Sequence, residues 1–296
     1  MFQGSMVALV TPFNAEGKLD SSALENLLQR QLEAGTDAIV INGTTGESPT
    51  LSLEETLQLI RRTVQIVCGQ VPIIAGTGSN CTATTIALSQ RALGLGVDAC
   101  LVIAPYYNRP TQAGLIAHYQ ALAEAVAMPL ILYNHPGRTG CDLWPATVAS
   151  LAKISNIIGI KEGMGDLNRL AALQELCEPD FCLFSGEDLT AGAFMLQGGH
   201  GVISVTANVA PRELKALAAA ALKGQRAEAL AWQTQLLPLN ESLFLESNPI
   251  PVKWALSRMG LIENRLRLPL TPLSQDKQKT VEDALVKSGI IATARI

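Results

Sequence analysis

The sequence has no run of basic residues, no membrane-length apolar stretch and no secretion signal. Its 296 residues carry a formal net charge of −4, which gives no reason to expect nucleic acid or an anionic membrane as a partner. No uninterrupted apolar stretch approaches the roughly 20 residues of a membrane span. Residues 1–5 lack the basic region that opens a signal peptide, so we expect a cytoplasmic protein.

The six cysteines and three histidines form no ligand pattern. No two cysteines have CxxC spacing, and Cys100 and Cys182 lie inside apolar runs, where a thiol acts as a small core residue. The histidines, His118, His135 and His200, show no metal-ligand spacing with cysteines or acids. We therefore predict no disulfide framework and no metal site.

Apolar, β-branched runs recur along the first two thirds of the chain and predict strands. They cover residues 6–10, 38–41, 71–75, 99–103, 130–133, 157–161, 181–185 and 201–205. The segments between them have helical apolar spacing, and two of them begin with capping-box patterns, Ser22 with Glu25 and Ser52 with Glu55. Eight strand–helix units predict a parallel sheet closed into a (β/α)8 barrel, an α/β fold.

A doubly wound open sheet is the alternative to a barrel. It would need a glycine-rich phosphate turn after the first strand, and residues 11–14 contain no glycine. Beyond the eighth strand the patterns are helical only, at residues 213–223, 226–237, 251–259 and 277–287. We predict a catalytic barrel at residues 1–224 and a C-terminal helical region at residues 225–296.

Lys161 ends the sixth apolar run and is the strongest candidate for a reactive group. Alternation in a strand would place Ile157, Gly159 and Lys161 on one face and Ile158 with Ile160 on the other. Full burial shifts the pKa of a lysine by roughly 3 units, which is about 4 kcal/mol. A neutral amine that forms a Schiff base with a carbonyl explains why a chain would bear that cost. A solvent-exposed lysine is the plainer interpretation of this residue taken alone.

The other predicted strand ends favour the reactive interpretation, because the working residues of a barrel lie there. Thr44 and Thr45 stand between two glycines, where hydroxyl and N–H groups can hold a carboxylate. Tyr133 offers a phenol for proton transfer, and Arg138 offers a guanidinium for a second carboxylate. Such a set needs neither metal nor cofactor and predicts a class I aldolase-like barrel acting on a 2-keto acid.

Six short motifs carry a family resemblance. They are GTTGE at 43–47, YYN at 106–108, YNHPGRTG at 133–140, GIKE at 159–162, GHGVIS at 199–204 and NPIPVK at 248–253. In order and spacing the chain resembles the dihydrodipicolinate synthase family from Met1 to about Ser288. Arg138 separates it from the sialic acid lyase branch, which has a similar turn and lysine but no arginine at this position. His135 and Pro49 depart from the usual family residues without removing a reacting group.

The resemblance implies a reaction and the residues that carry it out. Pyruvate would condense with Lys161, and Tyr133 would relay protons with help from Thr44 and from Tyr107 of a neighbouring subunit. The enamine would then attack L-aspartate 4-semialdehyde and give 4-hydroxy-tetrahydrodipicolinate, a precursor of diaminopimelate and lysine. Because Tyr107 would cross a subunit boundary, the family resemblance also implies a homo-oligomer, a tetramer built from tight dimers.

The resemblance also assigns residues that bind the substrates. The pyruvate carboxylate would sit on the turn that contains Thr45, and Arg138 would hold the carboxylate of the aldehyde. Ile203 would line the site through its backbone carbonyl. Two alternatives remain: an aldolase for sugar-derived 2-keto acids, against which Arg138 argues, and a non-catalytic ligand sensor, whose sequence would lack the lysine, the phenol or the threonines.

Feedback by lysine is expected to be weak or absent. In lysine-sensitive members of the family, a glutamate and histidines meet the amines of lysine at the dimer interface. The corresponding positions here are Ser48, Pro49, Leu53, Thr56, Asn80, Thr84 and Tyr106. Thr84 stands in place of the glutamate, and Leu53 and Thr56 stand in place of the histidines. An ammonium buried without a counter-charge costs several kcal/mol, so the pocket should bind lysine poorly. The alternative is that another acid, such as Glu47 or Glu54, replaces the missing glutamate.

Overall fold

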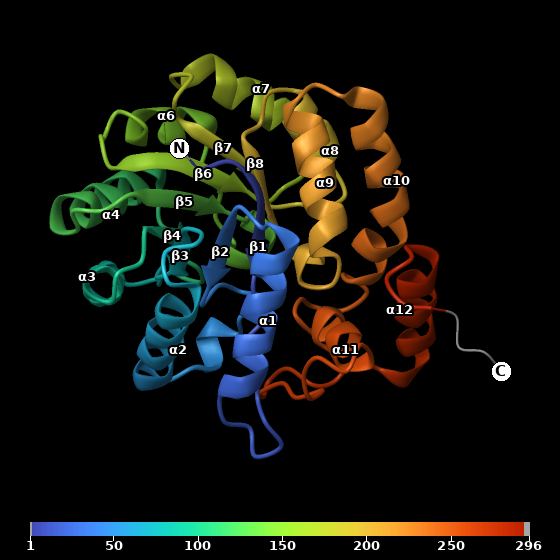
Figure 1. Cartoon of the computed structure of the whole chain (residues 1–296). Coiled ribbons are helices and arrows are strands. Elements are labelled where there is room, and N and C mark those ends of the chain that lie inside the picture. Colours follow the sequence, from blue (N-terminus) through green and yellow to red (C-terminus); the bar gives the residue numbers. More distant parts are fainter. Residues whose placement is uncertain (1, 293–296) are drawn as a thin grey trace.

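A closed ring of eight parallel strands forms the centre of the molecule (Figure 1). The computed structural model describes residues 2–292. The strands are β1 (Gly4–Ala8), β2 (Ala38–Ile41), β3 (Ile73–Gly76), β4 (Ala99–Ile103), β5 (Leu130–Asn134), β6 (Ile157–Glu162), β7 (Cys182–Ser185) and β8 (Gly201–Ser204). β1 pairs with both β2 and β8, with Met6 beside Ile203, so the sheet has no free edge. The predicted (β/α)8 barrel is confirmed, and each strand lies within two residues of its predicted position.

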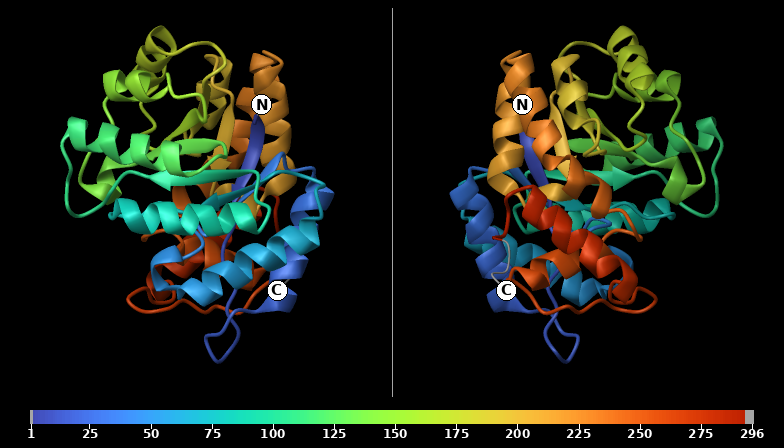
Figure 2. Two further views of the ribbon diagram at one scale, coloured as in Figure 1. Left: turned by 90° about the vertical axis from the view of Figure 1, so that its left-hand side faces the viewer. Right: turned by 90° about the vertical axis from the view of Figure 1, so that its right-hand side faces the viewer.

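A helix follows every strand and packs on the outside of the ring (Figure 2). In chain order these helices are α1 (Ser21–Ala34), α2 (Leu53–Val67), α3 (Thr82–Gly94), α4 (Gln112–Ala125), α6 (Pro145–Leu151), α7 (Leu167–Leu176), α8 (Ala191–Leu196) and α9 (Pro211–Leu222). Three single-turn helices, η1 (Ser48–Thr50), α5 (Pro136–Thr139) and η2 (Thr206–Asn208), lie in loops that leave the carboxyl ends of β2, β5 and β8. The irregular backbone of the molecule therefore gathers at the end of the barrel where a site is expected.

Strand alternation divides the apolar side chains into two layers. Met6, Leu101, Ile131 and Phe184 belong to the layer that fills the inside of the ring. The alternate residues of the strands face the helices and form a larger shell with them. Because both faces of every strand are buried, the strands read as continuous apolar runs in the sequence.

The predicted alternation fails at the start of β6. Ile157 packs in the outer layer with Ile160, whereas Ile158 packs against the inner layer. The register explains this difference, because Leu130 pairs with Ile157 while its successor Ile131 pairs with Gly159. One extra residue is thus accommodated in β6 as a bulge, which reverses the facing of the residues before it. The prediction that Ile157 shares a face with Lys161 was wrong, although Gly159 does share that face.

The two predicted helix starts have different outcomes. At α2, the Ser52 hydroxyl accepts a hydrogen bond from the Glu55 amide, and the Glu55 carboxylate accepts one from the Ser52 amide. This reciprocal pair confirms the capping box. At α1, Asp20 is the cap and accepts hydrogen bonds from the amides of Ser22 and Ala23. The predicted box at Ser22 was wrong, because the carboxylate two residues earlier already satisfies the free amides of the first turn.

The C-terminal part of the chain is helical, as predicted. Its helices are α10 (Arg226–Ser242), α11 (Ile250–Arg258) and α12 (Gln275–Lys287), and they lie on one flank of the barrel (Figure 1). The division of the chain into a barrel at 1–224 and a helical region at 225–296 stays a prediction, and residues 1 and 293–296 lie outside the described part. No helix within residues 2–292 is long and apolar enough to cross a membrane.

A fully buried ion pair joins the C-terminal helices to the loop after β2. Lys253, in α11, donates from Nζ to Glu47 Oε1 at 2.6 Å and to the Thr11 carbonyl at 2.9 Å. The second oxygen of Glu47 accepts a hydrogen bond from the Arg267 amide at 3.0 Å. Removing one partner of such a pair is strongly destabilising, because the remaining charge is buried alone. The pair therefore holds α11 against the turn that contains Thr44 and Thr45.

Candidate functional site

Lys161 lies at the carboxyl end of β6 and points into the barrel. It is paired in register with Tyr133 of β5, so both side chains rise from the same rim. Lys161 Nζ stands 4.5 Å from the centroid of the Tyr133 ring. Only 6% of the lysine surface is exposed, which makes the amine a buried group rather than a solvent-exposed strand end.

Gly186 makes room for this lysine. A Cβ at position 186 would lie 2.9 Å from Lys161 Cε and 3.0 Å from Gly163 Cα, distances that real Cβ atoms do not tolerate without movement. The Gly186 amide also donates to the Glu162 carbonyl at 2.7 Å, which ties the loop after β7 to β6. Sequence reasoning missed Gly186, because the glycine matters only through a neighbour on another strand.

Burial lowers the pKa of Lys161 to about 8, from an ordinary value of 10.5. Asp188 raises this pKa, Arg138 lowers it and Glu187 raises it, but burial is the largest of the causes. Within the described residues no carboxylate forms an ion pair with the lysine. Roughly a tenth of the amine is therefore neutral at pH 7, where an ordinary lysine is almost entirely charged. Neutrality is what a nucleophilic amine requires.

The phenol of Tyr133 is the second buried titratable group. Burial raises its pKa above the usual 10, while Arg138 and a side-chain hydrogen bond with Thr44 lower it. The phenol is therefore neutral near pH 7 and able to donate a proton. Thr44 follows β2 and Tyr133 lies near the end of β5, and both line one cavity. Sequence reasoning placed Tyr133 and Thr44 in one site, and the structure brings them together.

Asn248 connects the two predicted anion-binding elements. Its Nδ2 donates to Thr45 Oγ1 at 2.9 Å, and its carbonyl accepts from Arg138 Nη2 at 3.5 Å. Its own Oδ1 is buried and has no hydrogen-bond partner among residues 2–292. The sequence motif at 248–253 contains this residue, but no role was predicted for it, because it precedes a helix far from the barrel strands in sequence.

His135 borders the site and is uncharged at neutral pH. Burial, Arg138 and Lys161 together lower its pKa to about 4, with burial the largest cause. Its ring meets the Tyr133 ring edge-on, with centroids 6.2 Å apart. A histidine with this pKa adds no positive charge beside Lys161. The sequence assigned it no role, and the structure gives it a packing contact.

A cavity of about 30 Å3 brings most of the predicted residues together. Thr44, Thr45, Tyr133, Arg138 and Lys161 all line it. Gly186, Asn248 and Phe244 complete its wall with other residues that the sequence did not single out. Thus one amine, one phenol, two threonines and one guanidinium face a common space that is closed on its inner side by the barrel core.

Two predicted site residues do not line this cavity. Ile203 is buried in the inner layer of the barrel, which also contains Phe184 and Tyr133. Tyr107 is 88% exposed and has a positive φ of 74°, so its ring projects away from the chain that carries it.

Within residues 2–292, no group of three or more His, Cys, Asp and Glu side chains is arranged to hold a metal ion.

The closed barrel and its buried amine define the class of the protein as a (β/α)8-barrel enzyme with a lysine-centred site. A model of the dihydrodipicolinate synthetase family matches residues 1–288. The chain belongs to this family. A 4-hydroxy-tetrahydrodipicolinate synthase of Methylococcus capsulatus is 54% identical over 291 residues, which cover 98% of this chain and all of the relative.

Solved structures of the family have the same fold. Dihydrodipicolinate synthase from Acinetobacter baumannii, in complex with pyruvate, superposes with a TM-score of 0.97 at 48% identity and covers 98% of this chain and all of its own. A monomeric variant of dihydrodipicolinate synthase superposes with a TM-score of 0.96 at 42% identity, covering 98% of both chains. The similarity therefore includes the C-terminal helices as well as the barrel.

Replacing the buried lysine should change how stability depends on pH. The folded pKa of Lys161 is about 8 and the unfolded value is 10.5, so the unfolded state binds more protons between these values. The wild type should thus gain about 3 kcal/mol of stability from this group as pH rises through that window. Lys161→Met should lack the gain and be the more stable protein at pH 7.

Chemical denaturation of wild type and variant at a series of pH values measures this difference. Lys153→Met, at an exposed position, is the control and should follow the wild-type curve. Lys253 is present in all three proteins, so its own titration cancels in the comparison. Parallel curves for wild type and Lys161→Met would contradict the prediction.

Proposed function

We propose that this protein is a 4-hydroxy-tetrahydrodipicolinate synthase, which condenses pyruvate with L-aspartate 4-semialdehyde through a Schiff base on Lys161. The observation that supports this most directly is the buried lysine with a pKa of about 8 beside Tyr133, at the carboxyl end of a barrel strand. Family membership supports the same substrates. The reaction belongs to lysine and diaminopimelate biosynthesis, and we expect the enzyme to act in the cytoplasm.

The chemistry begins at the neutral amine. The Lys161 nitrogen adds to C2 of pyruvate, the carbonyl oxygen leaves as water, and a cationic imine remains. Loss of a C3 proton gives an enamine, whose C3 attacks the aldehyde carbon of the second substrate. Tyr133, whose phenol is neutral near pH 7, is placed to give and take back these protons, with Thr44 lining the same cavity. Attack of the substrate's own amine on the imine carbon closes the product ring and frees Lys161.

The two substrates need separate carboxylate sites. We assign the pyruvate carboxylate to Thr44 and Thr45, because they lie at the end of β2 and line the same cavity as Lys161. We assign the carboxylate of the aldehyde to Arg138, whose guanidinium faces the cavity from the loop after β5. The carbonyl of Ile203 is assigned to the floor of the site, below the cavity.

Tyr107 is assigned to the site of a neighbouring subunit. In its own chain the ring is 88% exposed, which leaves it accessible to an adjacent subunit. The proposed assembly is a tetramer of two tight dimers, in which Tyr107 extends the proton relay of the adjacent site. Sedimentation and mixing of inactive Lys161→Ala and Tyr107→Phe subunits would test this assignment separately from the chemistry.

Trapping with borohydride tests the proposed function. Incubation with pyruvate and borohydride, followed by digestion, should attach one pyruvate-derived group to Lys161 and none to other lysines. Lys253 is the internal control. Its pKa is also lowered to about 8, but Glu47 and the Thr11 carbonyl occupy its amine, so it should form no adduct. Lys161→Ala should give no adduct and no turnover. An adduct elsewhere, or turnover without Lys161, would refute the assignment.

Arg138→Ala should impair use of the aldehyde more than use of pyruvate. Arg138 lies in the loop beyond the strand, and a charge-assisted hydrogen bond contributes about 1.5–3 kcal/mol, or roughly a tenfold to hundredfold change in affinity. Steady-state kinetics should show a raised KM for aspartate semialdehyde, with pyruvate adduct formation near the wild-type rate. Equal losses for both substrates would argue against this division of roles.

Inhibition by lysine should be weak or absent. A second cavity of about 410 Å3 shares Thr44, Tyr133 and Arg138 with the Lys161 cavity. Five of the residues expected to bind lysine also line it, but Asn80 and Thr84 do not; the five are Ser48, Pro49, Leu53, Thr56 and Tyr106. Its wall of described residues contains no acid. Glu47 adjoins Ser48 but is held by Lys253 and the Arg267 amide, so it is not free to replace the missing charge. Glu54 adjoins Leu53 but is exposed and does not line the cavity. Two ammonium groups entering this cavity would find no counter-charge.

Initial rates measured against lysine concentration test this prediction, with sodium chloride at equal ionic strength as the control. Half-inhibition should require more than about 1 mM lysine, the level that corresponds to −4.1 kcal/mol. Half-inhibition well below that concentration would show that other groups bind the amines. Thr84→Glu, which restores an acid at the position expected to carry one, should increase sensitivity if the charge is what is missing.

A further inference from the structure

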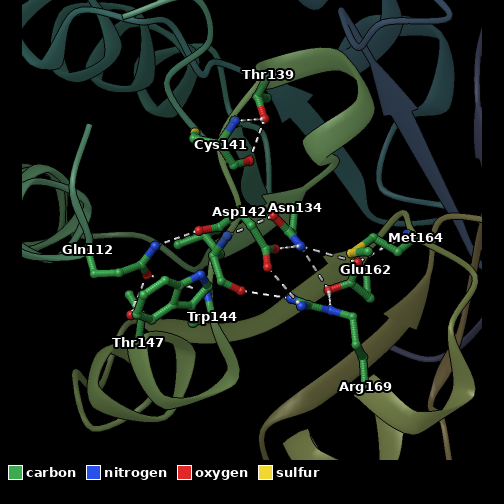
Figure 3. Close-up of polar contacts among 11 residues, drawn as sticks. Gln112, Asn134, Thr139, Cys141, Asp142, Trp144, Thr147, Glu162, Met164 and Arg169 are labelled. Atoms are coloured by element: carbon green, nitrogen blue, oxygen red, sulfur yellow. Dashed lines mark hydrogen bonds and ion pairs between the residues drawn. The ribbon is translucent and has the colours of Figure 1, made fainter. Parts of the chain in front are cut away.

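A cluster of polar side chains lies next to Lys161 and Tyr133, on the opposite face of strands β5 and β6. We define the Arg169 cluster as Asn134, Asp142, Glu162 and Arg169, which converge between β5, β6 and α7 (Figure 3). Glu162 and Asn134 are almost fully buried. None of the four lines the cavity that contains Lys161, so none is placed to touch a substrate there.

Each of the three nitrogens of the Arg169 guanidinium donates a hydrogen bond. Nε donates to Glu162 Oε2 at 2.9 Å, Nη1 to Asp142 Oδ2 at 3.0 Å and Nη2 to the Leu143 carbonyl at 2.8 Å. Asn134 Nδ2 bridges the same two carboxylates, at 2.8 Å from Asp142 Oδ1 and 3.1 Å from Glu162 Oε2. One cation and one amide thus fasten two acids from different segments in a single geometry.

Two residues of the Arg169 cluster are the direct neighbours in sequence of the site residues on β5 and β6. Asn134 directly follows Tyr133, Glu162 directly follows Lys161, and the two pairs stand in register with each other. Successive side chains in a strand point to opposite faces, so contacts on the outer face set the position of the inner face. Arg169 and Asn134 therefore fix the relative placement of the strand ends that carry the phenol and the amine.

The same cluster holds the loop that carries Arg138. Asp142 and Leu143 follow the short helix α5, and both are bound by Arg169. Gln112 of α4 holds this loop from the other side through the Asp142 carbonyl, at 2.7 Å (Figure 3). The loop is therefore clamped between α4 and α7, although it contributes a cavity-lining guanidinium at its other end.

Electrostatics make Arg169 the centre of the cluster. Burial raises the pKa of Glu162, and the neighbouring guanidinium and the Asn134 amide oppose this shift. Without a cation, two acids would share a largely buried space with no positive partner. A lysine at this position would restore the charge but has a single nitrogen, which cannot reproduce a planar fork directed at three acceptors.

We infer that Arg169 is a positioning residue for the reaction at Lys161, acting by fixing the carboxyl ends of β5 and β6 and the Arg138 loop in one arrangement. The inference rests on the proposed function, since it concerns the geometry of that site. The residue touches no reacting atom, so its effect passes through the residues that it holds.

Arg169→Lys is the main test, because it keeps the charge that the buried acids need while it removes the fork. Misplacement of reacting groups by about an ångström costs up to about a hundredfold in rate, so we expect kcat to fall by about tenfold to a hundredfold. Arg30→Lys is the matched control: Arg30 forms a similar fork with the carbonyls of Asn208 and Val209, away from β5 and β6. It should lower the unfolding temperature while leaving kcat and both KM values unchanged.

A second variant, Asp142→Asn, separates the effect of Arg169 on the Arg138 loop from its effect on the strand ends. Asp142→Asn weakens the link between Arg169 and the Arg138 loop and leaves the Glu162 contact in place. It should raise the KM for aspartate semialdehyde by several-fold with little effect on the rate of pyruvate adduct formation. Arg169→Lys should affect both, and should also move the pH midpoint of adduct formation upward, because looser packing brings water to an amine whose pKa burial lowers to about 8.

The outcomes separate the two proposals. Wild-type protein that forms no adduct at Lys161 would refute the proposed function. Normal wild-type adduct and turnover, with wild-type kcat, KM and pH midpoint in Arg169→Lys, would refute the positioning role and leave only a contribution to stability. If Arg169→Lys does not fold, Asp142→Asn decides the matter: an unchanged KM for the aldehyde would overturn the inference.

Discussion

Closure of the sheet is the constraint on which the rest of the structure depends. Hydrogen bonds between β1 and β8 complete the ring, and parallel pairing then places all eight carboxyl ends on one rim. Residues separated by more than a hundred positions, such as Thr44 and Lys161, meet there because each ends a strand. The barrel is narrow enough for apolar side chains to fill its interior. A polar group at the rim therefore packs on these apolar side chains and is partly removed from water.

Three cationic side chains differ in whether acids pair with them, and this difference separates the structural cations from the reactive one. Lys253 is fully buried against Glu47, and Arg169 is held by Glu162 and Asp142. Each is stabilised by acids that accept its hydrogen bonds, and each joins segments distant in sequence. Lys161 is also buried, with 6% of its surface exposed, but has no ion-pair partner among residues 2–292, and burial lowers its pKa to about 8. The pKa of Lys253 is also lowered to about 8, but Glu47 and the Thr11 carbonyl occupy its amine. The unpaired amine of Lys161 is therefore the one suited to act as a nucleophile.

The predictions that failed were those in which a local pattern competes with its surroundings. The capping box at Ser22 has suitable residues, but Asp20 reaches the free amides first. The alternation in β6 breaks at a bulge, which results from pairing with β5 and leaves no mark in the apolar run itself. Gly186 and Asn248 were missed for a related reason. Each is ordinary in its own segment and matters only because Lys161, or Thr45 with Arg138, lies beside it.

The sequence alone determined the eight strands, the order of strands and helices, and the lysine, phenol, threonines and arginine placed at strand ends. These follow from local chemistry, because apolar runs, helical periodicity and turn residues act over a few positions. Only the tertiary structure decided how far Lys161 is buried, which acids surround it and which contacts hold β5 against β6. Those properties depend on atoms from distant segments. Desolvation and ion pairing act through space, where Lys253 and Glu47, 206 residues apart along the chain, become partners at 2.6 Å.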